Sequence, residues 1–230
     1  MPSIGCFCRE ISLSKLSEIR RIGPGEIEKE SFAIIQKELE DRQISLPREQ
    51  APVTMRVIHT SADFDYAATM TYSDRAVEIA RELLKNGADI VTDTNMALAG
   101  INKKRLAALG GAAHCFMADE DVAALAAERG MTRAAVSMEK AKQIRKPVIF
   151  AIGNAPTALV RLYELMKEDS WRPAFIIGVP VGFVNVEAAK ELILETDIPY
   201  IVNRGRKGGS NIAAAVCNAL LYGITVPDIG

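Results

Sequence analysis

The chain has 230 residues, which is enough for one domain with a sizeable core or for two small domains at most. Hydrophobic residues make up 49% and charged residues 25% of the sequence, which is ordinary for a soluble globular protein and excludes a disordered or fibrous chain. The 28 Lys and Arg residues stand against 29 Asp and Glu residues, for a net charge of -1. We therefore expect no nucleic-acid partner, because nonspecific nucleic-acid binding requires a basic surface.

The cysteine pattern predicts a reducing, cytoplasmic setting. Four cysteines, Cys6, Cys8, Cys115 and Cys217, are too few and too scattered for a disulfide framework. Only His59 and His114 are available as imidazole ligands, so we expect no metal site. The sequence has no apolar run near the roughly 18 residues of a membrane span and no basic segment leading into an apolar N-terminal core, so we expect neither a membrane segment nor a secretory signal.

The N-terminal part of the sequence predicts an extension followed by helices. Residues 1–24 are the least patterned, and we place a single domain over residues 25–230. Apolar residues recur at a helical period from Ile27 to Leu39. A second helix is predicted from Pro47 to about His59. A third is predicted to begin at the N-cap Ser73 and to end at Asn86 and Gly87.

After residue 87, short β-rich runs alternate with helical stretches. Such alternation predicts parallel strands joined by right-handed crossovers, and the apolar character of both strand faces predicts helices on both sides of the sheet. The fold class is therefore α/β: a single doubly wound, mainly parallel sheet of about five strands, with helices on both faces and a helical N-terminal layer. The predicted strands are residues 89–92, 113–116, 148–152, 175–179 and 200–202.

Ligands of open α/β sheets bind beyond the carboxyl ends of the strands, so the strand-to-helix junctions are the informative positions. Asp93 and Thr94 follow the first predicted strand, with Met96 close behind. One interpretation makes Asp93 or Thr94 a helix cap, and the other places these side chains at a pocket mouth. The next junction predicts a helix start whose free N–H groups face an anion, or else a simple tight turn. It consists of Gly153, Asn154, Ala155, Pro156 and Thr157.

Two later junctions differ in polarity. Residues 178–185 are apolar, including Gly182, Phe183 and Val184, and predict either contact with a flat ligand or partner, or simply a longer strand. Residues 203–211 are cationic and glycine-rich, which favours an anion site over a solvated turn but matches no nucleotide-binding motif. The residues that suggest this anion site are Arg204, Gly205, Arg206, Lys207, Gly208, Gly209 and Ser210.

Three further residues have candidate roles. His59 lies near a helix C-terminus, where it is either structural or an acid that titrates near neutral pH. His114 lies within a predicted strand beside Cys115, which indicates a packing role. Arg133 begins a helix, where its charge is unfavourable unless an anionic ligand is near.

Taken together, these segments resemble the precorrin-8X methylmutase family, also called the cobalt-precorrin-8 methylmutases. The likeness extends over nearly the whole chain from about residue 25. The blocks Gly-Asn-Ala-Pro-Thr-Ala-Leu at 153–159 and Pro-Val-Gly-Phe-Val at 180–184 are highly specific in this order. The other matching segments are 30–35, 56–59, 92–93 with Met96, 132–135 and 204–210.

The resemblance implies a cofactor-free isomerase that moves a methyl group from C-11 to C-12 of a corrinoid in cobalamin biosynthesis. It also implies a homodimer with the active site near the subunit interface. His59 matches the family's catalytic histidine and is the expected general acid, and Ser31 matches a pocket residue. The expected substrate-binding residues are Ser31, Asp93, Met96, Arg133, Gly153, Asn154, Ala155, Pro156, Thr157, Gly182, Phe183, Val184, Arg204, Gly205, Gly208, Gly209 and Ser210.

Two other functions fit the same residues. A non-catalytic corrinoid carrier would use the same pocket but would bind its ligand without converting it. A generic anion- or nucleotide-binding α/β module would rest on the glycine-rich turns alone.

Overall fold

The computed structural model describes residues 16, 18, 19, 21–169 and 171–225. Most of the predicted extension, including Cys6 and Cys8, lies outside these described residues. The chain divides into two compact units, Met1–Arg42 and Gln43–Gly230.

The first unit contains the long helix α2 (Pro24–Asp41). This confirms the predicted helix at 27–39 and extends it at both ends. Along its surface, Lys37 is paired with Asp41 at 2.9 Å and Glu38 with Arg42 at 3.0 Å. Such pairs, four residues apart, stabilise a helix that is polar on most of its circumference.

The second unit is built on one six-stranded sheet with the strand order β1-β6-β5-β4-β2-β3. Neighbouring strands from β6 to β3 are parallel, while β1 pairs antiparallel with β6. All five predicted strands are present, and the sixth, β1, escaped prediction because three residues are too few to show an alternating pattern. The strands are β1 (Met70–Tyr72), β2 (Asp89–Thr92), β3 (Ala113–His114), β4 (Val148–Ile152), β5 (Phe175–Gly178) and β6 (Tyr200–Asn203).

The order of the strands reverses between β2 and β4. The chain first steps outward from β2 to β3, then crosses back to β4 and continues through β5 to β6. Thr92 of β2 is level with Ala151 of β4, so the two strands end side by side. This is the topological switch point, the place where open α/β sheets form their ligand crevice.

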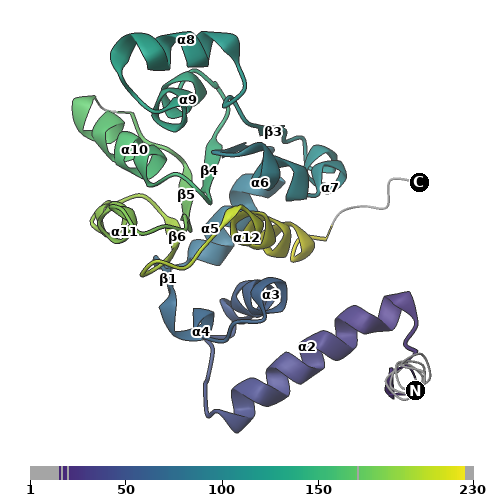
Figure 1. Ribbon diagram of the computed structural model, residues 1–230. Coiled ribbons are helices and arrows are strands. Elements are labelled where there is room, and N and C mark those ends of the chain that lie inside the picture. Colours follow the sequence, from purple (N-terminus) through teal and green to yellow (C-terminus); the bar gives the residue numbers. More distant parts are fainter. Residues whose placement is uncertain (1–15, 17, 20, 170, 226–230) are drawn as a thin grey trace, which may run out of the picture. The chain divides into compact units, whose positions relative to one another are not determined.

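Helices cover both faces of the sheet, as a doubly wound fold requires (Figure 1). One layer contains α3, α5, α6 and α12, and the other contains α8, α9, α10 and α11. Between them, strands β4 and β5 are buried along their whole length. The helices are α3 (Ala51–Ser61), α4 (Tyr66–Thr69), α5 (Ala76–Lys85), α6 (Asn95–Gly100), α7 (Lys103–Ala108), α8 (Glu120–Arg129), α9 (Arg133–Ala141), α10 (Pro156–Glu168), α11 (Val186–Leu194) and α12 (Ser210–Tyr222).

Two predicted helix starts are wrong. The second helix begins at Ala51, because Pro47 heads a turn whose carbonyl accepts the N–H groups of Gln50 and Ala51. The third begins at Ala76, and Ser73 is not its N-cap. The hydroxyl of Ser73 instead accepts the N–H of Tyr200 at 2.9 Å, which ties the end of β1 to β6.

None of the helices in the described part of the chain is both long enough and apolar enough to cross a membrane.

Candidate active site

The switch point is bridged by a buried carboxylate, that of Asp93. This residue directly follows β2 and its exposed fraction is 0%. Its oxygens accept the backbone N–H groups of Gly153 at 2.8 Å, Asn154 at 2.8 Å and Ala155 at 2.6 Å. The loop after β4 is therefore held in place by the side chain of the residue that follows β2.

This geometry corrects two predictions. Asp93 does not lie at a pocket mouth, because its side chain is fully buried. The N–H groups of Gly153, Asn154 and Ala155 do not face a ligand, because Asp93 already accepts them. Burial raises the pKa of Asp93, although the three N–H groups act in the opposite direction.

The capping interpretation is confirmed for Thr94. Its hydroxyl accepts the N–H of Ala97 at 3.1 Å, which caps α6. The same hydroxyl lies 2.7 Å from that of Ser210 at the start of α12. Two predicted junctions, the one after β2 and the one after β6, are therefore in direct contact.

A second contact joins the loops after β4 and β6. A Cβ atom on Gly153 would lie 2.7 Å from the carbonyl oxygen of Gly209 and 2.8 Å from the Cα of Ser210. Real side chains do not approach so closely, so glycine is required at residue 153. Gly208 is constrained in the same way, because its Cβ would lie 2.1 Å from the carbonyl oxygen of Val179.

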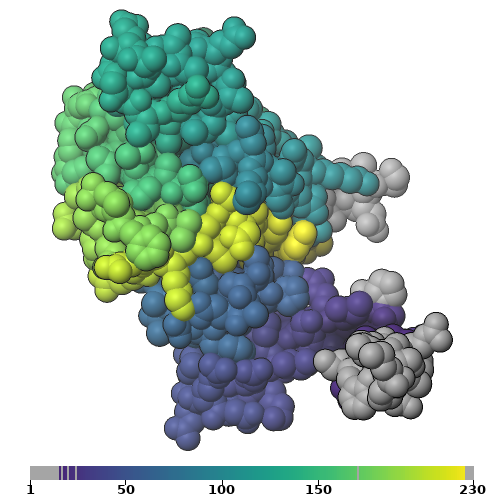
Figure 2. Space-filling model, in the orientation of Figure 1, coloured from purple at the N-terminus to yellow at the C-terminus, as the bar shows by residue number. Residues whose placement is uncertain are grey.

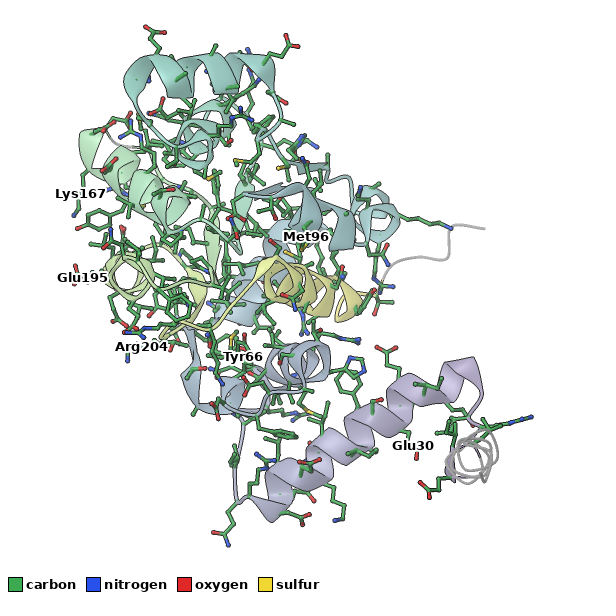
Figure 3. All side chains as sticks on the ribbon, in the orientation of Figure 1. Glu30, Tyr66, Met96, Lys167, Glu195 and Arg204 are labelled. Carbon is green, nitrogen blue, oxygen red and sulfur yellow. The ribbon has the colours of Figure 1, made fainter. Side chains whose placement is uncertain are left out.

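The loop after β5 exposes apolar side chains. The exposed fractions are 43% for Val181, 84% for Phe183 and 77% for Val184. The longer-strand interpretation is wrong, since β5 ends at Gly178. Met96, at the start of α6 on the same edge of the sheet, is 71% exposed (Figure 3). Apolar side chains are therefore exposed both in the loop after β5 and at the start of α6.

The loop after β6 exposes the three predicted cations, each beside a carboxylate. Arg204 pairs with Glu191 at 3.0 Å, and Arg206 with Glu187 at 2.8 Å. Lys207 pairs with Asp63 at 2.5 Å and Asp65 at 2.6 Å. In Figure 2, the part of the chain that carries this loop, coloured between yellow-green and yellow, reaches the molecular surface.

These pairs change the predicted role of the cations. The positive charges of Arg204, Arg206 and Lys207 are balanced, because each side chain forms an ion pair with at least one carboxylate. Exposed ion pairs contribute little stability, so ligand carboxylates can replace these partners at small cost. The Arg206 guanidinium also lies 5.8 Å from the centre of the Phe183 ring, which joins the cationic loop to the apolar surface.

His59 lies in the last turn of α3 and is exposed. The helix ends at Ala62 in a left-handed conformation with φ of 53°. The next residues, Asp63 and Asp65, hold Lys207, and in this way the segment that follows the His59 helix is tied to the cationic loop.

Two other predicted residues lie on separate elements. Arg133 is exposed at the first position of α9. The hydroxyl of Thr132, which caps this helix, lies 2.9 Å from the hydroxyl of Thr157 in the first turn of α10. Ser31 belongs to the first unit, where its hydroxyl donates to the carbonyl of Ile27 at 2.8 Å. Ser31 stays a prediction.

His114 has the packing role that its sequence context indicates. Its ring stacks on Phe116 with centroids 5.9 Å apart. Its Nε2 lies 2.9 Å from a carboxylate oxygen of Asp89, at the opposite end of β2 from Asp93.

Sequence reasoning missed three residues that shape this region: Asp63, Asp65 and Lys190. The two aspartates follow His59 closely, but their partner is more than 140 positions away. Lys190 looks like an ordinary surface lysine of a helix, and only its burial reveals otherwise. Within the described residues, no three His, Cys, Asp or Glu side chains gather where they could hold a metal ion.

The protein is thus a doubly wound α/β protein. Beyond the carboxyl ends of its strands it exposes apolar side chains, basic side chains in surface ion pairs, and a histidine. A family model for precorrin-8X methylmutase matches residues 26–223. The chain is 42% identical over 203 residues to the cobalt-precorrin-8 methylmutase of Leptospira interrogans, covering 85% of this chain and 91% of that one. It is also 42% identical to the Salmonella typhimurium protein of the same name, over 86% and 95% of the two chains.

A solved structure agrees. The crystal structure of precorrin-8X methylmutase from Thermus thermophilus superimposes with a TM-score of 0.77 at 36% identity, covering 86% of this chain and 96% of that one. The chain belongs to the precorrin-8X methylmutase family. It is therefore a methylmutase, an intramolecular isomerase.

Proposed function

We propose that this chain moves a methyl group from C-11 to C-12 of precorrin-8, or of its cobalt form, to give hydrogenobyrinate or cobyrinate in cobalamin biosynthesis. The observation that carries the proposal is the family match over residues 26–223, together with relatives that are themselves called methylmutases. Any cobalt is carried by the substrate, and no cofactor is needed for the rearrangement. The proposed methylmutase domain is residues 25–230, acting in the cytoplasm as a homodimer.

Substrate binding follows from the two surfaces at the carboxyl edge of the sheet. A corrinoid is a broad, partly apolar ring fringed with acetate and propionate carboxylates. The exposed Phe183, Val184 and Met96 side chains suit the ring. Arg204 and Arg206 suit the fringe, because guanidinium groups bind carboxylates through two parallel hydrogen bonds. Binding then exchanges an internal carboxylate partner for one on the substrate.

Most of the other predicted contacts fall into two groups, while Ala155, Pro156, Gly182, Gly205 and Ser210 stay predictions. Gly153, Gly208 and Gly209 support the site by allowing the loops to approach each other, and Asp93 fixes the loop after β4. Asn154 and Thr157 are exposed and remain proposed substrate contacts, as does Arg133. Ser31 is proposed to assist by hydrogen bonding.

The chemical step is proposed to need one proton donor. His59 protonates or hydrogen-bonds the macrocycle near the migrating methyl group and so favours the rearranged conjugation. The bond from the methyl carbon to C-11 breaks as the bond to C-12 forms, and any proton given by His59 returns to it before the product leaves, so the product is an isomer of the substrate. Positioned proton transfer of this kind is typically worth about 10²–10⁴-fold in rate.

The test is the visible spectrum of the pigment, because methyl migration changes its conjugation. We expect His59→Ala to bind the product corrinoid within about three-fold of wild type and to convert substrate about 10²–10⁴-fold more slowly. The matched control is His114→Ala, which removes the other histidine from the opposite end of β2 and should leave turnover per folded molecule unchanged. Wild-type turnover in the His59 variant would show that this histidine is not the acid.

The same experiment decides between enzyme and carrier. A carrier binds the substrate without a time-dependent spectral change, whereas the proposed enzyme converts it. The relatives are named for catalysis and do not favour the carrier.

A further inference from the structure

We infer that Lys190 is a positioning residue of this site, whose buried ammonium group holds the backbone of the cationic loop, residues 204–209, in the shape that presents its side chains. The identity of the ligand in this inference rests on the proposed function. The effect on the loop does not.

The geometry is that of an internal clamp. Lys190 lies on α11, and its exposed fraction is 0%. Its Nζ donates to the carbonyl oxygen of Gly205 at 2.7 Å and to that of Lys207 at 2.8 Å. The Lys207 carbonyl also accepts the side-chain amide of Asn203 at 2.8 Å. Two carbonyls of one short loop are thus fastened to a neighbouring helix and to the end of β6.

Burying the charged side chain of Lys190 costs free energy, which indicates that its hydrogen bonds have a role. A buried ammonium group loses its hydration, and here the partners that replace water are neutral carbonyls. Burial accordingly lowers the pKa of Lys190 to about 8, although the charge of Glu187 acts in the opposite direction. An apolar residue would fill the same helix position without this cost, but it would leave both carbonyls without their donor.

The backbone and the side chains of the cationic loop face different surroundings. The carbonyls of residues 205 and 207 are engaged by Lys190 within the fold, while the side chains of Arg204 and Arg206 are 55% and 63% exposed. Figure 3 labels Arg204 at this edge of the unit. Fixing the backbone therefore limits the directions in which the guanidinium groups reach out.

The clamp also reaches the apolar loop. The N–H of Gly182 donates to the carbonyl of Arg206 at 3.2 Å, and that of Gly209 donates to the carbonyl of Val179 at 2.9 Å. The cationic and apolar loops are thus joined by backbone hydrogen bonds at Arg206, between the two residues held by Lys190, and at Gly209, two residues beyond them. Loosening the cationic loop should loosen both halves of the binding surface together.

The experiment replaces Lys190 with Met, which keeps the length of the side chain and removes its donors. Amide hydrogen exchange on the full chain, without ligand, should accelerate about ten-fold over residues 181–184 and 204–209 and stay unchanged in β4 and β5. KM and the Kd of the product corrinoid should rise about ten-fold, with kcat within about three-fold. The matched control, Lys140→Met on α9, removes a lysine paired with Asp119 and Asp121 and should change none of these.

Unchanged exchange in the two loops would overturn the inference, as would faster exchange spread evenly over the chain. Lys190→Gln restores a neutral N–H donor, so it should recover part of the loop protection, and it replaces the Met variant in every comparison if that variant does not fold. The exchange measurement needs no substrate. A wild-type protein that fails to convert the corrinoid therefore counts against the proposed function and leaves the clamp to be judged by exchange.

Discussion

Strand β2 begins and ends beside a buried aspartate, and the two are held in different ways. Asp89, its first residue, is 5% exposed and contacts two side chains, His114 at 2.9 Å and Lys146 at 3.4 Å. Its carboxylate also accepts the N–H of Ala112 at 2.9 Å. Asp93, just after the strand, is fully buried and accepts three backbone N–H groups of the loop after β4.

The pKa values of the two carboxyls move in opposite directions. Burial alone would raise the pKa of Asp89, but the hydrogen bonds from His114 and the Ala112 N–H outweigh it and the pKa is lowered. Burial dominates at Asp93, and its pKa is raised. One end of β2 therefore stabilises the fold through a charge pair, whereas the other bears the cost of burying a carboxyl group that holds the loop after β4.

Of the two aspartates of this comparison, Asp93 should be the more sensitive to replacement by Asn. An amide offers one acceptor oxygen in place of two and turns its NH₂ group toward backbone N–H groups. We expect the free energy of unfolding to fall by about 1–3 kcal/mol and turnover to fall with it, because the loop after β4 loses its anchor. Urea unfolding and turnover per folded molecule measure the two effects. A variant with wild-type stability would show that the three hydrogen bonds do not hold this loop.

A smaller effect is expected at the other end, for Asp89→Asn. The new amide oxygen still accepts the Ala112 N–H, and only the charge pair with His114 and Lys146 is weakened. The free energy of unfolding should fall by less than about 1.5 kcal/mol, with turnover per folded molecule unchanged. If turnover fell as far as in the Asp93 variant, the two ends of β2 would not be functionally distinct.

The smallest effect is a difference in pH dependence. Because its folded-state pKa is lowered, Asp89 contributes stability that is present above about pH 4 and is lost as pH falls through the folded-state value. The stability gap between wild type and Asp89→Asn should therefore close in acid. Asp93 has a raised pKa, so protonation favours the folded state, and the gap to Asp93→Asn should not close over the same range. Urea unfolding between pH 3 and pH 7 checks both trends, and parallel curves would contradict them.

The sequence predicts the sheet better than the site because of distance along the chain. Apolar runs such as residues 148–152 and 175–178 identify buried strands locally, and only the three-residue β1 was too short to detect. The partners of Asp93 lie 60 to 62 residues away, and those of Lys207 lie 142 and 144 residues away. No local pattern encodes such pairings, which is why the sequence indicates where the strand-to-helix junctions lie but not which hydrogen bonds and ion pairs form there.

The roles of Arg204, Arg206 and Lys190 could not be predicted from the sequence for the same reason. Local spacing marks Arg204 and Arg206 as cations in a glycine-rich loop, but their acidic partners lie on α11. Lys190, on that same helix, resembles its exposed neighbours until the fold buries it.

We propose that the ligand binds at the Asp93 end of the sheet, against His59 and the cationic loop. The most direct measurement is a crystal structure of the full chain with the product corrinoid bound. We expect the ring to lie beside His59 and the Phe183 loop, with its carboxylates within hydrogen-bond distance of Arg204, Arg206 or Lys207. A ring bound elsewhere, for example beside Asp89 and His114, with those cations still on their internal partners, would contradict it.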